Sequence, residues 1–319
     1  MHRLLSLLSR HAALVLAFGV FGGLLVPVLA HWLRSTLPVA VAGLLFLSVL
    51  RIDWDRFVAQ RARPRLIGAA LLWILVLGVA LIYPMTRLLP IPPPLATAVV
   101  LAAAAPPIVS GPAIAVLIGL DGALMLALVV VASLLAPFTL AAVASLVPGA
   151  GLALAPLALL ARLATLIGGC FLAAQAVRAV VGAPRLARAH PALDTASVVL
   201  LLLFAVAVMD GVPARFAHDA PGATLIVAAA FAVNLVLQSV TGLVFMKAGR
   251  RTALTVAFAG GNRNLALLLA VLPINAAPDL LLFCALAQFP IYLLPALLAP
   301  LYRRLLAAAP SNQEKVSVV

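Results

Sequence analysis

Charged residues are scarce in this sequence. Only 9% of its 319 residues are Asp, Glu, Lys or Arg, whereas 66% are hydrophobic and the mean hydropathy is +1.25. Soluble domains carry about 25% charged residues, and their cores do not need so much apolar surface. The composition therefore excludes an ordinary soluble domain and predicts an all-α protein that crosses the membrane many times.

The sequence also lacks the residue patterns of several other classes of protein. Its two cysteines, Cys170 and Cys284, lie in apolar runs without CxxC or metal-ligand spacing, so a disulfide framework is not expected. No P-loop occurs, which argues against energisation by ATP within this chain. No pair of aspartates, Ser/His pair or metal triad lies inside an apolar segment, so we predict that the chain is not an intramembrane enzyme.

What the sequence has in abundance is apolar segments separated by short basic clusters. If the N-terminus is cytoplasmic, sixteen Lys and Arg residues fall on the cytoplasmic side and three, Arg34, Arg87 and Arg215, on the other. This bias is the usual orientation signal, so we predict a multi-pass protein of the cell (inner) membrane with both termini cytoplasmic. The net charge of +13 therefore indicates contact with the lipid bilayer, with no nucleic acid as partner. The ten predicted spans are 12–33, 36–50, 65–84, 93–118, 121–147, 155–181, 193–210, 222–246, 252–273 and 279–302.

The two halves of the chain match under a shift of 158 residues, which places Asp121 on Asp279 and Pro137 on Pro295. Each half contains five spans, an odd number, so the second half must enter the membrane from the opposite side. Inverted repeats of this kind are the architecture of many secondary transporters. The predicted domains are a first five-helix repeat, an inverted second repeat and a cytoplasmic tail, at 1–147, 148–305 and 306–319.

Two spans contain residues that interrupt a helix. The fourth span carries three prolines and a glycine at 105–112, and each proline removes a backbone donor. The ninth carries Gly-Gly-Asn-Arg-Asn at 260–264, where Arg263 would cost roughly 2.5 to 3.5 kcal/mol if it faced lipid. We therefore predict that helices 4 and 9 are discontinuous and that Arg263 faces an interior or aqueous space. Candidate substrate- or ion-binding residues in the breaks are Ser110, Gly111, Pro112, Gly260, Gly261, Asn262, Arg263 and Asn264.

Other polar residues share single faces of neighbouring spans. Asn234 and Gln238 are four residues apart in the eighth span, as are Gln288 and Tyr292 in the tenth. Two interpretations stay open for such residues: hydrogen bonds between helices, worth about 0.6 kcal/mol on average, or a binding surface. We include Asn234, Gln238 and Gln288 among the candidate binding residues.

These motifs, in this order, resemble the bile acid:sodium symporter family over nearly the whole chain. The resemblance rests on the fourth-span break, the turn at 119–121, the run Ser-Leu-Leu-Ala-Pro at 133–137 and the block at 260–266. It implies a core domain of helices 3–5 and 8–10, in which the broken helices cross, and a panel domain of helices 1–2 and 6–7 that moves against it. It also implies sodium-driven uptake of a small organic anion, with sodium near Ser133, Asn262 and Asn264.

The chain departs from the family pattern at two places. Gly111-Pro112 stand where the family has a Ser-Asn pair, and no carboxylate occurs at 256–259, before the amides of the ninth helix. A second hypothesis therefore makes Arg263 a fixed cation that neutralises carbonyl ends or binds an anionic substrate group, without sodium. The predicted function is a secondary transporter of a small organic anion that works by alternating access. The alternatives are a permease or exporter of another small solute, such as arsenite or a metabolite, and a uniporter or channel of the same fold.

Overall fold

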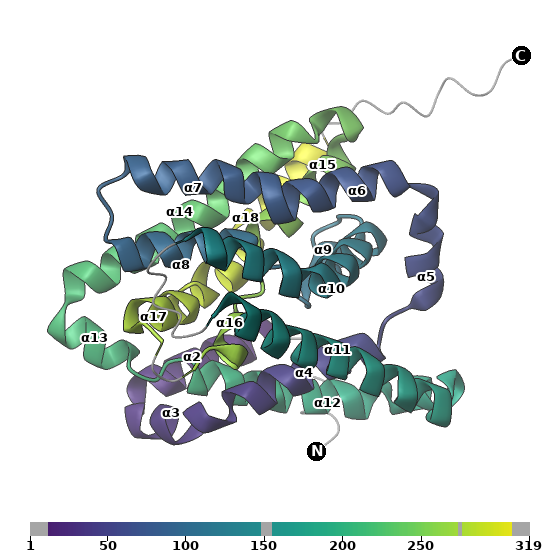
Figure 1. Ribbon diagram of the computed structural model, residues 1–319. Helices are drawn as coiled ribbons and strands as arrows, with labels where there is room; N and C mark the ends of the chain where they lie inside the picture. Colours follow the sequence, from purple (N-terminus) through teal and green to yellow (C-terminus); the bar gives the residue numbers. More distant parts are fainter. Residues whose placement is uncertain (1–11, 148–154, 274–275, 308–319) are drawn as a thin grey trace, which may run out of the picture.

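The computed structural model describes residues 12–147, 155–273 and 276–307. These residues form helices joined by short turns and loops, and the part described contains no β-strand, which confirms the all-α prediction. Most helices run roughly along one common direction, so the bundle has two ends (Figure 1). Of the predicted tail 306–319, everything beyond Ala307 lies outside the described residues.

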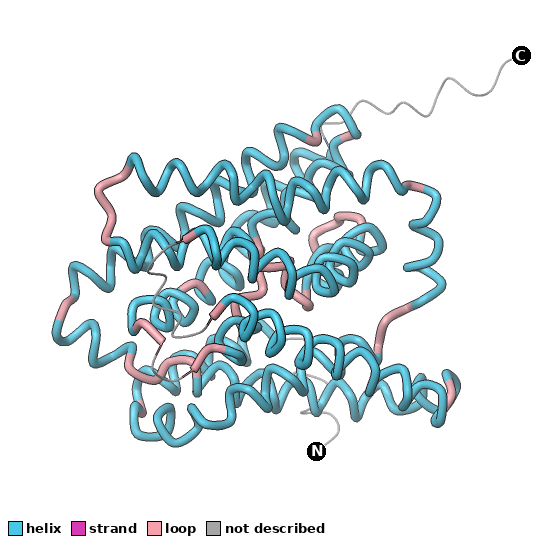
Figure 2. The backbone as a smooth tube through the Cα atoms, viewed as in Figure 1, coloured by secondary structure: helices cyan, strands magenta, loops and turns pink. Residues whose placement is uncertain are grey.

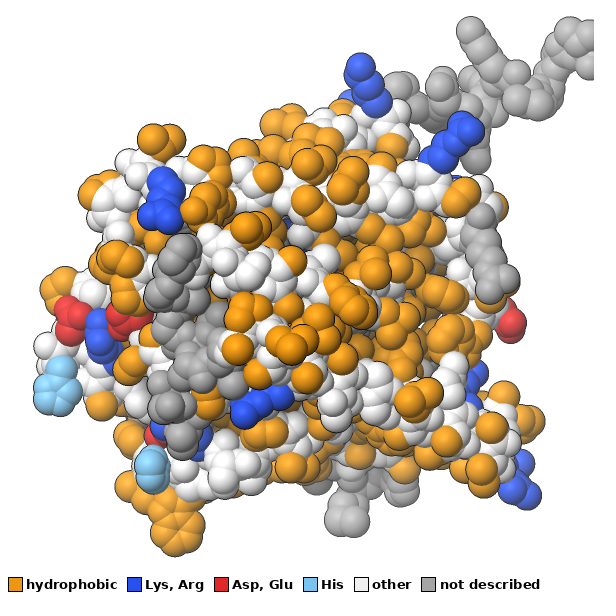
Figure 3. All heavy atoms as spheres, in the orientation of Figure 1, with side chains coloured by type: hydrophobic (Ala, Val, Ile, Leu, Met, Phe, Trp, Pro, Cys, Tyr) orange, Lys and Arg blue, Asp and Glu red, His pale blue; other side chains and the backbone are white. Residues whose placement is uncertain are grey.

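Among the described residues, seven helical stretches are long and apolar enough to cross a membrane. Hydrophobic side chains cover the middle of the face shown in Figure 3, while most charged side chains lie toward its left and right edges. Both observations indicate a multi-pass membrane protein. The seven stretches are Pro27–Leu50, Pro64–Leu88, Gly122–Leu146, Pro156–Val181, Ala183–His218, Ala220–Val244 and Pro278–Ala307.

In the first half of the chain, several helices begin at a proline, where the missing N–H would have had no partner in any case. Asp121 caps α10, because its side chain accepts hydrogen bonds from the N–H groups of Ala123 (3.1 Å) and Leu124 (3.0 Å). The elements are α2 (Ala12–Leu25), α3 (Pro27–Leu33), η1 (Arg34–Thr36), α4 (Leu37–Leu50), α5 (Trp54–Ala59), η2 (Gln60–Ala62), α6 (Pro64–Leu72), the π-helix η3 (Trp73–Leu77), α7 (Gly78–Leu88), α8 (Pro93–Ala104), α9 (Gly111–Leu117) and α10 (Gly122–Leu146).

In the second half, glycines make the tightest connections. Gly182, between α11 and α12, has φ of 81°, and Gly249, before α15, has φ of 96°; such values favour glycine because it lacks a Cβ. The elements are α11 (Pro156–Val181), α12 (Ala183–Ala207), α13 (Val212–His218), α14 (Ala220–Val244), η4 (Met246–Ala248), α15 (Arg250–Gly261), α16 (Ala266–Val271), α17 (Pro278–Leu286) and α18 (Gln288–Ala307).

Some predicted bounds were wrong. The first span, predicted as 12–33, is divided at Val26 because Pro27 cannot continue the hydrogen-bond ladder of α2 and begins α3 instead. The seventh, predicted as 193–210, begins ten residues earlier as α12, at Ala183. The first turns of α12 are polar, so a search for apolar runs in the sequence does not detect them.

The packing brings the two interrupted regions into the interior. α2 and α4 pack against α12, and α4 also packs against α11, along the lower side of Figure 1. On the upper side α14 packs along α15, and α7 packs on α8. Figure 2 shows stretches of loop inside this bundle as well as at its ends.

Candidate functional site

The helices interrupted at α8/α9 and α15/α16 contact one another at their interruptions. Pro107 and Arg263 form an isolated antiparallel bridge, so two short extended segments pair where helices would otherwise continue. The discontinuity of both spans, predicted from the prolines and glycines, is confirmed, and the structure brings the two breaks into contact. The two hydrogen bonds run from the Ile108 N–H to the Asn262 carbonyl (2.9 Å) and from the Asn264 N–H to the Pro106 carbonyl (2.7 Å).

Two glycines allow α15 to lie directly against α14. A Cβ on Gly260 would lie 2.6 Å from the Thr241 hydroxyl oxygen, and one on Gly261 would lie 2.2 Å from Cγ of Gln238. Such distances are too short for real side chains, so any larger residue would push the helices apart. Gly260 and Gly261, which we had predicted as binding residues, thus act here as close-packing positions.

The buried amides of α14 and α15 are hydrogen-bonded to each other. Nε2 of Gln238 donates to Oδ1 of Asn234, and the Tyr302 hydroxyl donates to Oε1 of Gln238. Nδ2 of Asn234 donates to Oδ1 of Asn262 (3.4 Å), whose own Nδ2 donates to the Phe258 carbonyl (3.0 Å). Of the two interpretations left open for Asn234 and Gln238, the structure therefore supports hydrogen bonding between helices. Tyr302, on α18, was missed because nothing in its local sequence indicates a partner 64 residues away.

Arg263 is buried at the crossing, with 3% of its surface exposed, as predicted. Its Nη1 donates to the carbonyls of Ala105 and Ile74, each at 3.0 Å. Ala105 follows the last residue of α8, and Ile74 belongs to the π-helix η3, where the i→i+4 ladder is locally broken. Nε and Nη2 are buried and have no partner among the described residues. The guanidinium thus links the end of α8 to the π-helix η3 of the preceding helical stretch.

A cavity of about 630 Å³ opens beside the crossing. Five of the predicted site residues line it: Ser110, Pro112, Arg263, Asn264 and Gln288. The structure thus brings together residues from both breaks and from α18. Further polar or charged lining residues are Ser48, Arg51, Asp53, Arg56, His190, Asp194, Ser197 and Tyr292.

The charged groups of this cavity are partly paired. Arg51 donates to Asp194 (2.7 Å) and to the Ser197 hydroxyl (2.7 Å), which ties the end of α4 to α12. Arg56 pairs with Asp53 at 3.0 Å. With Arg263, three arginines face two aspartates, so the cavity is formally positive and favours an anion. We did not identify these lining residues from the sequence, because charges at span ends usually set orientation.

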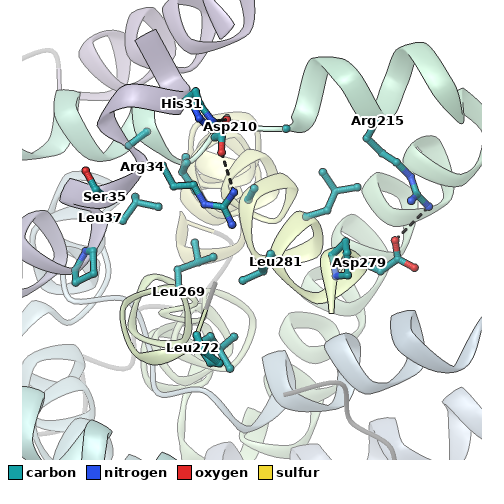
Figure 4. A pocket seen from close by; sticks show the side chains of 18 residues that line it. His31, Arg34, Ser35, Leu37, Asp210, Arg215, Leu269, Leu272, Asp279 and Leu281 are labelled. Atoms are coloured by element: carbon teal, nitrogen blue, oxygen red, sulfur yellow. Dashed lines mark hydrogen bonds and ion pairs between the residues drawn. The ribbon is translucent and has the colours of Figure 1, made fainter. Parts of the chain in front are cut away.

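A second cavity, of about 550 Å³, is shown in Figure 4. Arg34 pairs with Asp210 at 3.0 Å, and Arg215 pairs with Asp279 at 3.1 Å, so both arginines bind carboxylates at its wall (Figure 4). The second pair joins α13 to α17. This cavity is therefore rimmed by ion pairs.

The two cavities lie at opposite ends of the same elements. α4 lines the 550 Å³ cavity with Leu37 and the 630 Å³ cavity with residues from Val41 onward. α16 lines the larger cavity with Leu267 and the smaller one with Leu269, and Leu268 between them is fully buried. Among the described residues, none lines both cavities. The two cavities therefore share no described wall residue, and on α16 the buried Leu268 lies between their linings.

The residues suggested for sodium do not share one space. Ser133 has a buried hydroxyl without a described partner and lines a separate cavity of about 30 Å³. Both ends of the Asn262 amide are hydrogen-bonded, and of the three residues only Asn264 lines the large cavity. A hard cation needs several oxygen ligands around one point. The described residues therefore do not fit a sodium site built from Ser133, Asn262 and Asn264.

The chain matches none of the family models and none of the curated protein sequences with which it was compared. The resemblance to bile acid:sodium symporters stays a prediction from the motifs. The function is therefore inferred from the crossing, its arginine and the two cavities.

Proposed function

We propose that this protein is a secondary transporter that moves a small organic anion across the membrane by alternating access. The observation that carries the proposal is the contact between the two interrupted helices beside a cavity of about 630 Å³. Interrupted helices expose backbone groups inside a membrane protein, and transporters bind substrates and ions at such points. Here the same point also carries a guanidinium and an amide that line the cavity.

We count ten membrane segments: the seven long stretches, α2, and the interrupted pairs α8/α9 and α15/α16. The interrupted helices are then the fourth and ninth membrane segments, and the two halves have opposite orientations. Element bounds support the repeat, because a shift of 158 residues moves Pro64–Leu88 to 222–246, beside Ala220–Val244, and Pro93–Ala104 to 251–262, beside Arg250–Gly261.

Contacts at the crossing support the repeat further. The same shift makes Pro106 equivalent to Asn264 and Ala105 equivalent to Arg263. The Asn264 N–H donates to the Pro106 carbonyl at 2.7 Å, and Arg263 donates to the Ala105 carbonyl at 3.0 Å. Equivalent residues of two symmetric units touch only near the axis that relates them. We infer that the axis between the halves passes through the crossing.

The two cavities support alternating access. Each lies between one group of helices, α2–α4 with α11 and α12, and the remainder of the bundle, at opposite ends of α4, α12 and α16. We assign the first group as the panel domain and α6–α10 with α14–α18 as the core domain. The larger cavity, at the end of Arg51 and His190, opens to the cytoplasm, where both termini lie. An open channel would need one continuous path, whereas the two cavities share no described lining residue.

The proposal is tested by closing the larger cavity. Ala113 on α9 lines it, so Ala113→Trp would fill the space beside the crossing. We expect uptake of small carboxylates and sulfonates into proteoliposomes, screened as a panel, to fall to background in this variant. Leu117→Trp, one turn along α9 and 75% exposed, should retain the uptake of the unmodified protein. Normal uptake by Ala113→Trp, or no uptake of any anion by folded unmodified protein, would contradict the proposal.

A further inference from the structure

Two helices direct their C-termini, the negative ends of their dipoles, toward the crossing. α8 and α15, of twelve residues each, both reach it with their C-termini. The last carbonyls of a helix have no partner within it, and the aligned peptide dipoles place about half a negative charge there. A crossing of this kind needs a positive charge or N–H donors.

Arg263 supplies that charge from within the chain. It is the one charged residue among the buried polar residues of the described part, so no buried carboxylate balances it. Its Nη1 lies 3.0 Å from the carbonyl of Ala105 at the end of α8 and 3.0 Å from that of Ile74. The backbone of Arg263 is itself held by the bridge to Pro107. Backbone and side chain together fix the guanidinium at the crossing.

Five oxygen atoms at the crossing already have donors. The Pro106 carbonyl accepts from the Asn264 N–H, the Asn262 carbonyl accepts from the Ile108 N–H, and the Asn262 side-chain oxygen accepts from Asn234. The Ala105 and Ile74 carbonyls accept from Arg263. A hard cation binds by gathering several free oxygens, and these five are already engaged by N–H donors of the chain.

We infer that Arg263 is a tethered cation, which holds the position of a dissociable cation at the crossing, so that the transport cycle takes up no metal cation there. The inference rests on the proposed transport function and specifies its coupling. It favours one of the two roles considered for Arg263, because Nη1 donates to two carbonyls, whereas Nε and Nη2 are buried and have no partner among the described residues. The anionic substrate then binds to the other groups of that cavity.

The first experiment removes the tethered cation and offers a free one. Arg263→Ala leaves the Ala105 and Ile74 carbonyls without donors in a space that fits a guanidinium ion. We expect its Tm in detergent to fall by several degrees, and millimolar guanidinium chloride to restore part of that loss relative to choline chloride. Arg162→Ala is the matched control, because Arg162 also donates to a carbonyl, that of Val271 at 2.9 Å, but is exposed. Its Tm should not respond to guanidinium.

The second experiment uses the unmodified protein and so does not depend on the folding of a variant. Its Tm and its uptake of anion into proteoliposomes should be the same in sodium, potassium and choline chloride. Stabilisation or uptake specific to sodium would overturn the inference and leave the transport function standing. Equal guanidinium responses of Arg263→Ala and Arg162→Ala would also overturn it. Absence of uptake in every salt, with guanidinium rescue intact, would contradict the transport function alone.

Discussion

At the scale of single residues, the two glycines of α15 have a packing role that the sequence alone did not reveal. Gly260 and Gly261 stand beside the arginine of the break, which made a binding role attractive. Their Cβ positions are instead occupied by α14 side chains, at 2.6 and 2.2 Å. A glycine pair in a sequence indicates close approach, but the approaching group becomes visible only when the helices are placed.

Gly261→Ala should therefore destabilise the protein. The added methyl group would overlap Gln238 and the Asn234 backbone, and overpacking of this kind costs about 1 to 3 kcal/mol. Thermal unfolding in detergent measures the loss. Gly168→Ala in α11 is the control, because nothing lies within 4 Å of its Cβ position and alanine favours a helix by up to about 1 kcal/mol. A Tm for Gly261→Ala equal to or above that of Gly168→Ala would contradict the close packing.

At the scale of elements, the interruptions were predictable and the partners were not. Prolines at 106 and 107 and glycines at 260 and 261 weaken the helix in which they themselves lie, so the breaks in α8/α9 and α15/α16 could be located from the sequence. The hydrogen bonds of Asn234 and Gln238 reach α15 and α18, which only the fold brings near. The bounds of α12 were wrong for a related reason, since its polar first turns extend beyond the apolar signal.

α10 offers a prediction at this scale. Asp121 accepts hydrogen bonds from two N–H groups of its first turn, at 3.1 and 3.0 Å. Replacement of such an N-cap by alanine costs about 0.5 to 2 kcal/mol. Asp121→Ala should therefore lower the Tm measured by thermal unfolding. Asp121→Asn, which retains the acceptor oxygen, should recover most of the loss, and equal losses in the two variants would show that the charge matters and the cap does not.

At the scale of the whole molecule, the composition and the basic residues were enough to predict a multi-pass helical protein, because each long helix is itself apolar along its length. The two cavities could not be predicted. They depend on where α4, α12 and α16 lie relative to each other, which involves small differences in packing along apolar surfaces that look alike in sequence.

Alternating access makes a prediction about these cavities. Ser35 lines the 550 Å³ cavity and Ser48 the 630 Å³ cavity, so Ser35→Cys and Ser48→Cys place a thiol in each, while Cys170 and Cys284 are buried. A membrane-impermeant maleimide is added to either side of the membrane, with and without a transported anion. We expect the anion to raise labelling at one position and lower it at the other. A simultaneous rise at both would indicate a channel.

The contact between Pro106 and Asn264 has one more consequence for the cycle. If the two halves exchange conformations about the proposed axis, the helices move least near that axis, where the Asn264 N–H donates to the Pro106 carbonyl. The two peptide hydrogen bonds of the crossing would then stay in place as a pivot while the access of both cavities changes.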